Sequence, residues 1–145
     1  MSVPAVSIVL PLFNGQAHIA GTLHSLAAQT FQDAELVIVD DGGTDGSAAL
    51  AARICGEGDA PVLRACRIIR QANQGVAAAR NAGVAAARAA WIAFVDQDDL
   101  WLPQKLSAQM QAVAASAGAA WHYTGFVRFY DDGREVAKLD GSGDR

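Results

Sequence analysis

Residues Trp91–Trp101 read WIAFVDQDDLW and join an apolar run directly to a cluster of acidic residues. The first half is a short apolar run that suits a strand buried in a sheet. The second half places three carboxylates, Asp96, Asp98 and Asp99, within four residues. Two such charges about 4 Å apart repel each other by ~4 kcal/mol at an effective dielectric constant of ~20. The stretch therefore predicts open water, raised pKa values or a bound cation at the end of this strand.

Outward from this stretch, the chain repeats the pattern of an apolar strand followed by a helix. Short runs rich in Val and Ile predict strands at 5–12, 34–40, 62–70 and 91–96. Segments with helical spacing or strong helix formers follow them at 16–30, 45–56, 76–90 and 102–116. Four strand–helix units predict an α/β fold with a parallel sheet and right-handed crossovers. Residues 121–139 instead alternate aromatic and polar residues around Asp132-Gly133, which predicts a β-hairpin.

Length and composition predict one ordinary globular domain. The 145 residues are 52% apolar and 18% charged, which suits a folded core of a single domain. We expect residues 1–145 to form that domain, with the strand–helix units at 1–117 and a hairpin region and tail at 118–145. The net charge is −4 and Lys and Arg do not cluster, so nucleic acid is not an expected partner.

The cysteines and the apolar segments indicate in which cellular compartment the protein is expected. Cys55 and Cys66 lack a metal-type spacing, so we interpret them as small buried hydrophobes in a reducing compartment, with a disulfide as the alternative. The N-terminal apolar run is short, contains Pro11 and lacks a basic region. The Ala-rich segment 75–95 is interrupted by Arg80 and Arg88. We therefore expect neither a signal peptide nor a membrane span, and we expect a soluble, cytoplasmic protein.

The unusual residues follow the predicted strands. The four strands are followed in turn by PLFNG, DDGGTDGS, NQG and DQDD. Ligands of open parallel sheets bind outside the carboxyl ends of the strands, so these loops are expected to form one acidic, glycine-rich rim. A plain strand–turn–helix junction is an equal alternative for DDGGTDGS alone. A carboxylate in this position can also accept hydrogen bonds from the amide or imide edge of a nucleobase.

The acidic turn favours a divalent cation. Mg²⁺ and Mn²⁺ prefer six oxygen ligands, take one or two protein carboxylates and complete their shell with water and phosphate. We therefore interpret Asp96 and Asp98 as a pair that holds Mg²⁺ or Mn²⁺ on a bound diphosphate. The alternative is that Asp98 or Asp99 caps a helix that begins near Trp101 while the other acids are solvated. For Asp99 a cap and a ligand role remain equally open.

Taken together, the motifs resemble a known family. VSIVLPLFNGQAHIAGTLHSLAAQTF, ELVIVDDGGTDGS, QANQGVAAARNAGVAAARAAWIAFVDQDDLW and WHYTGFVRFYDDG resemble, in order and spacing, the N-terminal half of family 2 inverting glycosyltransferases. The resemblance covers nearly the whole chain, although the family usually has Ser where Gly43 stands. It implies the GT-A fold, a Rossmann-like three-layer sandwich with a mainly parallel central sheet, here truncated before the acceptor half.

The resemblance also implies roles for individual residues. Pro11 and Phe13 would line a nucleobase slot, although each alone suits strand-end packing. Asp41 would accept a hydrogen bond from a uracil-type imide, while Asp40 is the better candidate for bracing its loop. The remaining residues implied to border the donor are Asn73, Gly75, Arg80 and Asp96.

The acidic turn would supply the metal site. In this family Asp96 and Asp98 correspond to a D-x-D pair that touches the ribose and a metal on the diphosphate. Asp98 is the better candidate for direct ligation. Arg80 would lie near the base or the phosphates, although alone it reads as a solvated helix residue.

The implied activity is transfer of a sugar from a nucleoside-diphosphate donor, by default a UDP-sugar, to a glycan or lipid-linked acceptor. The general base would come from the family's second half, so we expect it outside this chain and do not expect Asp131, Asp132 or Asp140 to replace it. A non-catalytic nucleotide or nucleotide-sugar-binding module is the alternative. The family also suggests cell-surface polysaccharide synthesis of the bacterial type, with peripheral association at the inner face of the membrane as an option.

Overall fold

The computed structural model describes residues 2–116, 118–130 and 132–139. It divides into two compact units, Met1–Lys105 and Leu106–Arg145. The first unit contains a four-stranded parallel sheet, which confirms the predicted α/β class. Its strands are β1 (Val6–Leu12), β2 (Ala34–Asp40), β3 (Cys66–Arg70) and β4 (Trp91–Phe94).

Strands β1 and β2 form the buried centre of the sheet. Every residue of both strands is buried, as their largely apolar runs predict, and the buried set includes the polar residues Ser7, Glu35 and Asp40. The two strands pair in register along their full length, from Val6 opposite Ala34 to Leu12 opposite Asp40. Their carboxyl ends are therefore level, and the loops that follow them begin side by side.

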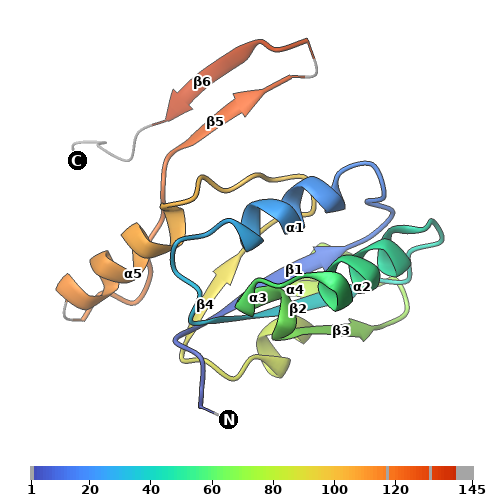
Figure 1. Cartoon of the computed structure of the whole chain (residues 1–145), viewed down its shortest axis with the longest axis horizontal. Coiled ribbons are helices and arrows are strands. Elements are labelled where there is room, and N and C mark those ends of the chain that lie inside the picture. The colour runs from blue at the N-terminus through green and yellow to red at the C-terminus, as the bar shows by residue number, and fades with distance from the viewer. Residues whose placement is uncertain (1, 117, 131, 140–145) are drawn as a thin grey trace. The chain divides into compact units, whose positions relative to one another are not determined.

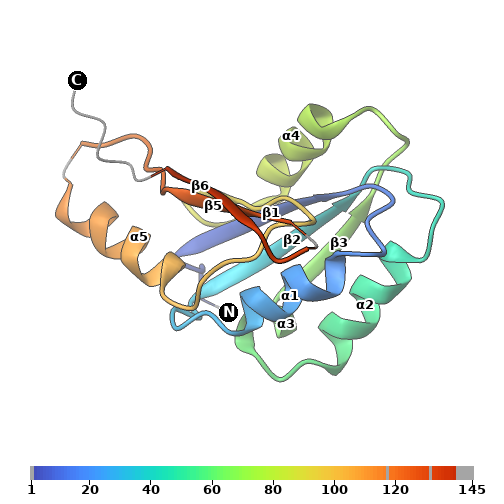
Figure 2. The ribbon, with the colours of Figure 1, turned by 90° about the horizontal axis from the view of Figure 1, so that it is seen from above.

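Helices cover both faces of the sheet (Figures 1 and 2). Helices α1 (Ile19–Ala27), α2 (Ser47–Glu57) and α3 (Pro61–Arg64) lie on one face, and α4 (Val76–Ala86) lies on the other. Three layers result, in which α1 buries the side chains of Ile19, Leu23 and Leu26.

Helix α4 approaches the sheet closely because small residues face the strands. Ala79 is buried against Val37 and Val39. A Cβ atom on Gly83 would lie 2.3 Å from Cγ1 of Val9, so only glycine fits at this position without a shift.

The strand order β3-β2-β1-β4 contains a topological switch. The chain builds outward from β1 to β2 and β3, then returns to place β4 on the other side of β1. A crevice forms at such a switch, outside the carboxyl ends of the two strands where the order reverses. Here these strands are β1 and β4, and the acidic turn follows β4.

The predicted strand at 62–70 is wrong in its first half. Residues Pro61–Arg64 form helix α3, with Pro61 at the start and Val62 and Leu63 buried. Proline suits the first helical position because its fixed φ is helical and its missing N–H is not needed there. Pairing with β2 begins only at Cys66, opposite Leu36, and the strand starts at that residue.

The second unit contains most of α5 (Lys105–Ala115) and a two-stranded antiparallel sheet. Strands β5 (Phe126–Phe129) and β6 (Glu135–Leu139) pair with each other, and Gly133 in the connecting turn has a φ of +81°. The predicted hairpin is thus confirmed. Within the described residues, no helix combines the length and apolarity that a bilayer crossing requires.

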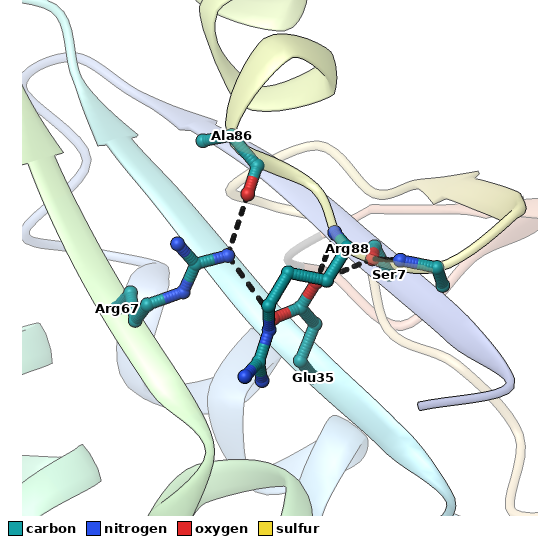
Figure 3. Close-up of polar contacts among 6 residues, drawn as sticks. Ser7, Glu35, Arg67, Ala86 and Arg88 are labelled. Atoms are coloured by element: carbon teal, nitrogen blue, oxygen red, sulfur yellow. Dashed lines mark hydrogen bonds and ion pairs between the residues drawn. The ribbon is translucent and has the colours of Figure 1, made fainter. Parts of the chain in front are cut away.

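A buried carboxylate fixes the C-terminal end of α4 (Figure 3). Glu35 Oε1 accepts hydrogen bonds from Ser7 Oγ (2.6 Å) and Arg88 N (2.7 Å). Its Oε2 accepts from Arg88 Nε (2.8 Å) and Arg67 Nη2 (3.0 Å), and Arg67 also donates to the carbonyl of Ala86 (2.6 Å). Burial alone would raise the pKa of Glu35, but the bonds from Ser7 and Arg88 and the charge of Arg67 lower the pKa to about 2.

Candidate functional site

A cleft of about 530 Å³ lies where the loops after the strands of the first unit meet. It contains every residue predicted from the sequence to border the donor or the metal, with the exception of Asp40. The lining residues are Pro11, Leu12, Phe13, Asp41, Asn73, Gly75, Val76, Ala79, Arg80, Asp96, Gln97 and Asp98.

Asp40 is buried at the base of the loop that follows β2. Its Oδ1 accepts a hydrogen bond from Gly43 N (3.0 Å), and its Oδ2 lies 3.6 Å from Arg70 Nε. The side chain therefore holds the first turn of its own loop and the end of β3.

Asp41 joins the loop after β2 to the loop after β3. Its Oδ1 accepts hydrogen bonds from Gln71 Nε2 (2.7 Å) and Gln74 N (2.9 Å), and its Oδ2 accepts one from Gly75 N (2.8 Å). The bond from Gln71, followed by those from Gln74 and Gly75, lowers the pKa of Asp41 against the opposing effect of burial. A carboxylate offers about four acceptor positions, so these three bonds leave one position on Oδ2 without a partner among the described residues.

The backbone of Gly75 is suited to this contact. Gly75 precedes the first residue of α4 and has a φ of +90°, a conformation that L side chains disfavour. Its N–H points at Asp41 instead of into the helix. The N-terminus of α4, and with it one wall of the cleft, is thereby fixed to β2.

The loop after β1 is held from two sides. The N–H of Phe13 donates to Gln97 Oε1 (2.8 Å), and the carbonyl of Phe13 accepts from Gln97 Nε2 (3.0 Å). Asn14, which has a φ of +48°, accepts hydrogen bonds at its Oδ1 from Thr44 N (2.8 Å) and Asp45 N (3.2 Å). The side chain of Phe13 remains 43% exposed beside the cleft.

The three acids after β4 differ in their surroundings. Asp96 pairs with Arg80, whose Nη2 lies 2.6 Å from Asp96 Oδ1. Asp98 forms no hydrogen bond or ion pair with the part of the chain that the structure describes. Burial, and then the charges of Asp96 and Asp98, raise the pKa of Asp99 against the opposing charge of Lys105. The expected repulsion thus appears as a raised pKa at Asp99 and an ion pair at Asp96.

The start of α5 and the surroundings of Arg80 bear on the roles expected for this turn. Helix α5 begins at Lys105, so the alternative interpretation, that Asp98 or Asp99 caps a helix starting near Trp101, is wrong. The Nε atom of Arg80 is buried and has no hydrogen-bond partner among the described residues. An arginine N–H without a partner is a donor that an anionic or carbonyl oxygen in the cleft can satisfy.

The donor atoms of the turn suit a hard cation. Asp96 and Asp98 supply carboxylate oxygens, which Mg²⁺ and Mn²⁺ favour, and the cleft lining includes no His or Cys. Over the described ranges, no three His, Cys, Asp or Glu side chains gather as a complete metal centre. The residues therefore fit an ion that takes two protein ligands and completes its shell from other molecules.

The amide side chains that connect these loops are not among the residues predicted from the sequence. Gln71, Gln97 and Asn14 each bridge two loops through their side chains. For Gln97 the sequence holds a signal, its position between Asp96 and Asp98, because an amide both donates and accepts hydrogen bonds; Gln71 and Asn14 have no acidic neighbour in the sequence.

Fold and cleft together define a Rossmann-like α/β domain with a cleft at its topological switch. The chain belongs to glycosyl transferase family 2, because the sequence model of that family matches residues 7–138. One relative is TuaG of Bacillus subtilis (strain 168), provisionally named a teichuronic acid biosynthesis glycosyltransferase. It is 30% identical over 136 residues, which are 94% of this chain and 52% of TuaG.

Solved glycosyltransferase structures share the fold. TarS 1–349 of S. aureus in complex with UDP-GlcNAc superposes with a TM-score of 0.62 at 26% identity, over 74% of this chain and 30% of that chain. The mannosyltransferase PcManGT of Pyrobaculum calidifontis, in complex with GDP-Man and Mn²⁺, gives a TM-score of 0.69 at 24% identity, over 81% and 34%. The predicted GT-A fold is confirmed. The chain spans about half of TuaG and about a third of each of these structures.

Proposed function

We propose that the cleft binds the nucleoside-diphosphate end of a sugar donor, and that the protein transfers the sugar to an acceptor hydroxyl with inversion. The observation that carries this proposal is the meeting of Phe13, Asp41, Asp96 and Asp98 in one cleft. These residues come from three loops and supply an aromatic face, an ionised acceptor and two metal-type carboxylates. Such a set offers contacts for the base, the ribose and the metal-bound diphosphate of a nucleoside diphosphate.

The nucleobase would occupy the side of the cleft near Phe13 and Asp41. The exposed ring of Phe13, next to Pro11, offers a surface for stacking. The free position on Asp41 Oδ2 suits the N–H of a uracil-type imide, and its lowered pKa keeps that oxygen an acceptor at neutral pH. Asn73 and Gly75 border the same space. UDP is therefore the default nucleotide, and the relative TarS has been solved with UDP-GlcNAc.

The ribose and diphosphate would lie toward Arg80 and the acidic turn. The unpartnered Nε of Arg80 supplies a donor for a ligand oxygen, and its ion pair keeps Asp96 at the cleft wall. Asp98, which has no other described partner, is the direct metal ligand of the proposal, and Asp96 would contact the ribose or share the metal. A bound Mg²⁺ or Mn²⁺ would neutralise charge on the departing diphosphate as a Lewis acid.

The acceptor side is assigned to parts of the protein other than this cleft. An inverting displacement needs an Asp or Glu that removes the proton of the acceptor hydroxyl. Asp132 is engaged with Arg134, whose Nε lies 2.6 Å from its Oδ2, and Asp131 and Asp140 lie outside the described residues. We do not assign the base to any of these three residues, and we expect a glycan or lipid-linked acceptor from surface polysaccharide synthesis at the inner face of the membrane.

Calorimetric titration with UDP, GDP and CDP, with and without Mn²⁺, tests the donor site. We expect UDP to bind best and Mn²⁺ to strengthen its binding by about tenfold or more. Asp98→Asn should abolish the effect of Mn²⁺, whereas the matched change Asp59→Asn should not, because Asp59 is fully exposed and pairs only with Arg64. Equal affinity for all three nucleotides, or indifference to Mn²⁺, would refute the donor site.

A transfer assay separates the enzyme from a binding module. Release of UDP from a UDP-sugar, dependent on both acceptor and Mn²⁺, is expected from the full-length protein. Tight, metal-dependent binding without any release would instead support the non-catalytic nucleotide-sugar-binding module.

A further inference from the structure

Gln97, the residue between the two aspartates, connects the acidic turn to the loop after β1. Its side-chain amide accepts from Phe13 N–H (2.8 Å) and donates to the Phe13 carbonyl (3.0 Å). The carbonyl of Gln97 itself accepts from Oγ1 of Thr22, which is fully buried on α1 (2.8 Å). The backbone of Gln97 is therefore fixed by α1, and its side chain is fixed by Phe13.

The two bonds lie where β1 and β4 separate. Pairing between these strands runs from Val6 opposite Trp91 to Val9 opposite Phe94, and a last backbone bond joins Val95 N to the Val9 carbonyl (3.1 Å). Beyond this point the strands part and the cleft opens. A primary amide presents one donor and one acceptor side by side, as a peptide group does. The Gln97 side chain thus replaces a strand pairing across the opening.

From this geometry we infer that Gln97 is a positioning residue that couples the nucleobase slot to the metal-binding turn, an inference that rests on the function proposed above. Phe13 is the aromatic surface of the slot, and Asp96 and Asp98 flank Gln97 in the chain. A shift of the turn on metal binding is transmitted to Phe13 through two hydrogen bonds. We expect base recognition and metal binding to strengthen each other, and linkage requires that each raises the affinity for the other by the same factor.

Further bonds complete a circuit around the cleft. Side-chain bonds join neighbouring loops in the order of the strands, and the ion pair to α4 closes the circuit. The pairs are Gln97 with Phe13, Asn14 with Thr44, Asp41 with Gln74, and Arg80 with Asp96. The link through Gln97 is the direct one between the acidic turn and Phe13.

The fit of Gln97 depends on Gly15. A Cβ atom at position 15 would lie 2.6 Å from Gln97 Oε1 and 2.7 Å from its Cδ. Gly15 does not require glycine for its backbone, since its φ lies outside the positive range. The variant Gly15→Ala therefore displaces the amide without straining the main chain, and it provides an independent way to break the link.

Gln97→Met tests the inference, because methionine keeps the length of the side chain and removes both hydrogen bonds. Gln111→Met, an exposed position on α5, is the matched control. For Gln97→Met we expect UDP affinity to fall by about tenfold and the factor by which Mn²⁺ strengthens UDP binding to fall by about fivefold. Gly15→Ala should reproduce both changes, and Gln111→Met neither. The thermal midpoints of the variants separate these effects from loss of fold.

Hydrogen exchange of the Phe13 amide proton reports on its hydrogen bond to Gln97 in the absence of any ligand. In the wild type we expect protection of this amide, and in Gln97→Met an exchange rate about tenfold faster. If wild type binds UDP with the help of Mn²⁺ but Gln97→Met keeps the same Mn²⁺ factor, the coupling role is refuted while the donor site stands. If wild type binds no nucleotide, the donor site is refuted and the coupling role falls with it.

Discussion

Glu35 and Asp41 hold opposite ends of helix α4 from opposite ends of strand β2. Glu35, near the start of β2, accepts from the backbone N–H of Arg88, two residues past the helix. Asp41, directly after β2, accepts from the backbone N–H of Gly75, which precedes the helix. Arg80 projects from the helix between these anchors and pairs with Asp96 in the cleft. The buried carboxylate of Glu35, near the amino end of β2, therefore helps to set the geometry of the cleft at the carboxyl ends of the strands.

The Glu35 cluster predicts a specific loss of stability in acid. The pKa of Glu35 is lowered from 4.5 to about 2 in the folded protein. Its contribution to the free energy of unfolding is therefore complete above about pH 4.5 and is lost as the pH falls toward 2. Glu35→Gln should lower the free energy of unfolding by about 2 kcal/mol at neutral pH. It should also flatten the pH dependence between pH 4.5 and 2.

Urea unfolding of wild type and variant across this pH range measures both effects. Asp59→Asn is the control, because Asp59 is exposed and its ion pair with Arg64 lies at the surface. An unchanged slope below pH 4.5 in Glu35→Gln would show that the buried carboxylate does not govern acid stability.

The contact between Gly83 and Val9 predicts a strong penalty for the smallest substitution. Alanine is the better helix former by ~1 kcal/mol. Its Cβ, however, would lie 2.3 Å from Cγ1 of the fully buried Val9. We expect Gly83→Ala to lower the free energy of unfolding by about 2 kcal/mol, because overpacking outweighs the helix propensity. The double variant with Val9→Ala should lose less than the sum of the single losses by about 1 kcal/mol. Additive losses in denaturant unfolding would contradict this packing.

Gly42 is predicted to be essential to the cleft while Gly56 is not. Gly42 has a φ of +74°, and a Cβ there would lie 2.8 Å from the backbone N of Asn73. Gly42→Ala should cost about 2 kcal/mol in stability through backbone strain and displacement of the Asn73 loop. It should also weaken UDP binding. Gly56 lies in α2 with open space around it, so Gly56→Ala should add ~0.5–1 kcal/mol and leave UDP binding unchanged. Thermal unfolding and calorimetry on both variants check the contrast.

The parts of the fold that follow from continuous burial could be predicted from the sequence. Val6–Leu12 and Ala34–Asp40 are buried throughout, and runs made mostly of Val, Ile and Leu suit that environment. The cleft residues could be predicted because the carboxyl ends of parallel strands meet, which brings Asp41 close to Asp96 and Asp98 without knowledge of any contact.

Other features depend on contacts that local patterns do not encode. The run from Val62 to Arg70 is short and rich in apolar residues, and periodicity does not separate a buried helical turn from a strand of that length. The Gln97–Phe13 link joins residues 84 positions apart, and it depends on how far β1 and β4 diverge. The partners of Asp41 likewise come from a loop whose path is set by the positive φ of Gly75.

If the four loops form one site for a nucleoside diphosphate, amide shift mapping should locate the bound nucleotide there. UDP with Mg²⁺ is titrated into ¹⁵N-labelled protein, and the shifts of assigned backbone amides are followed. We expect the largest changes to cluster at Phe13, Asp41, Asn73, Gly75 and residues 96–98, with Arg67 and Arg88 at the opposite end of the strands unchanged. Shift changes centred on the residues around Glu35, or scattered over the surface while the cleft amides stay unchanged, would contradict a nucleotide site in the cleft.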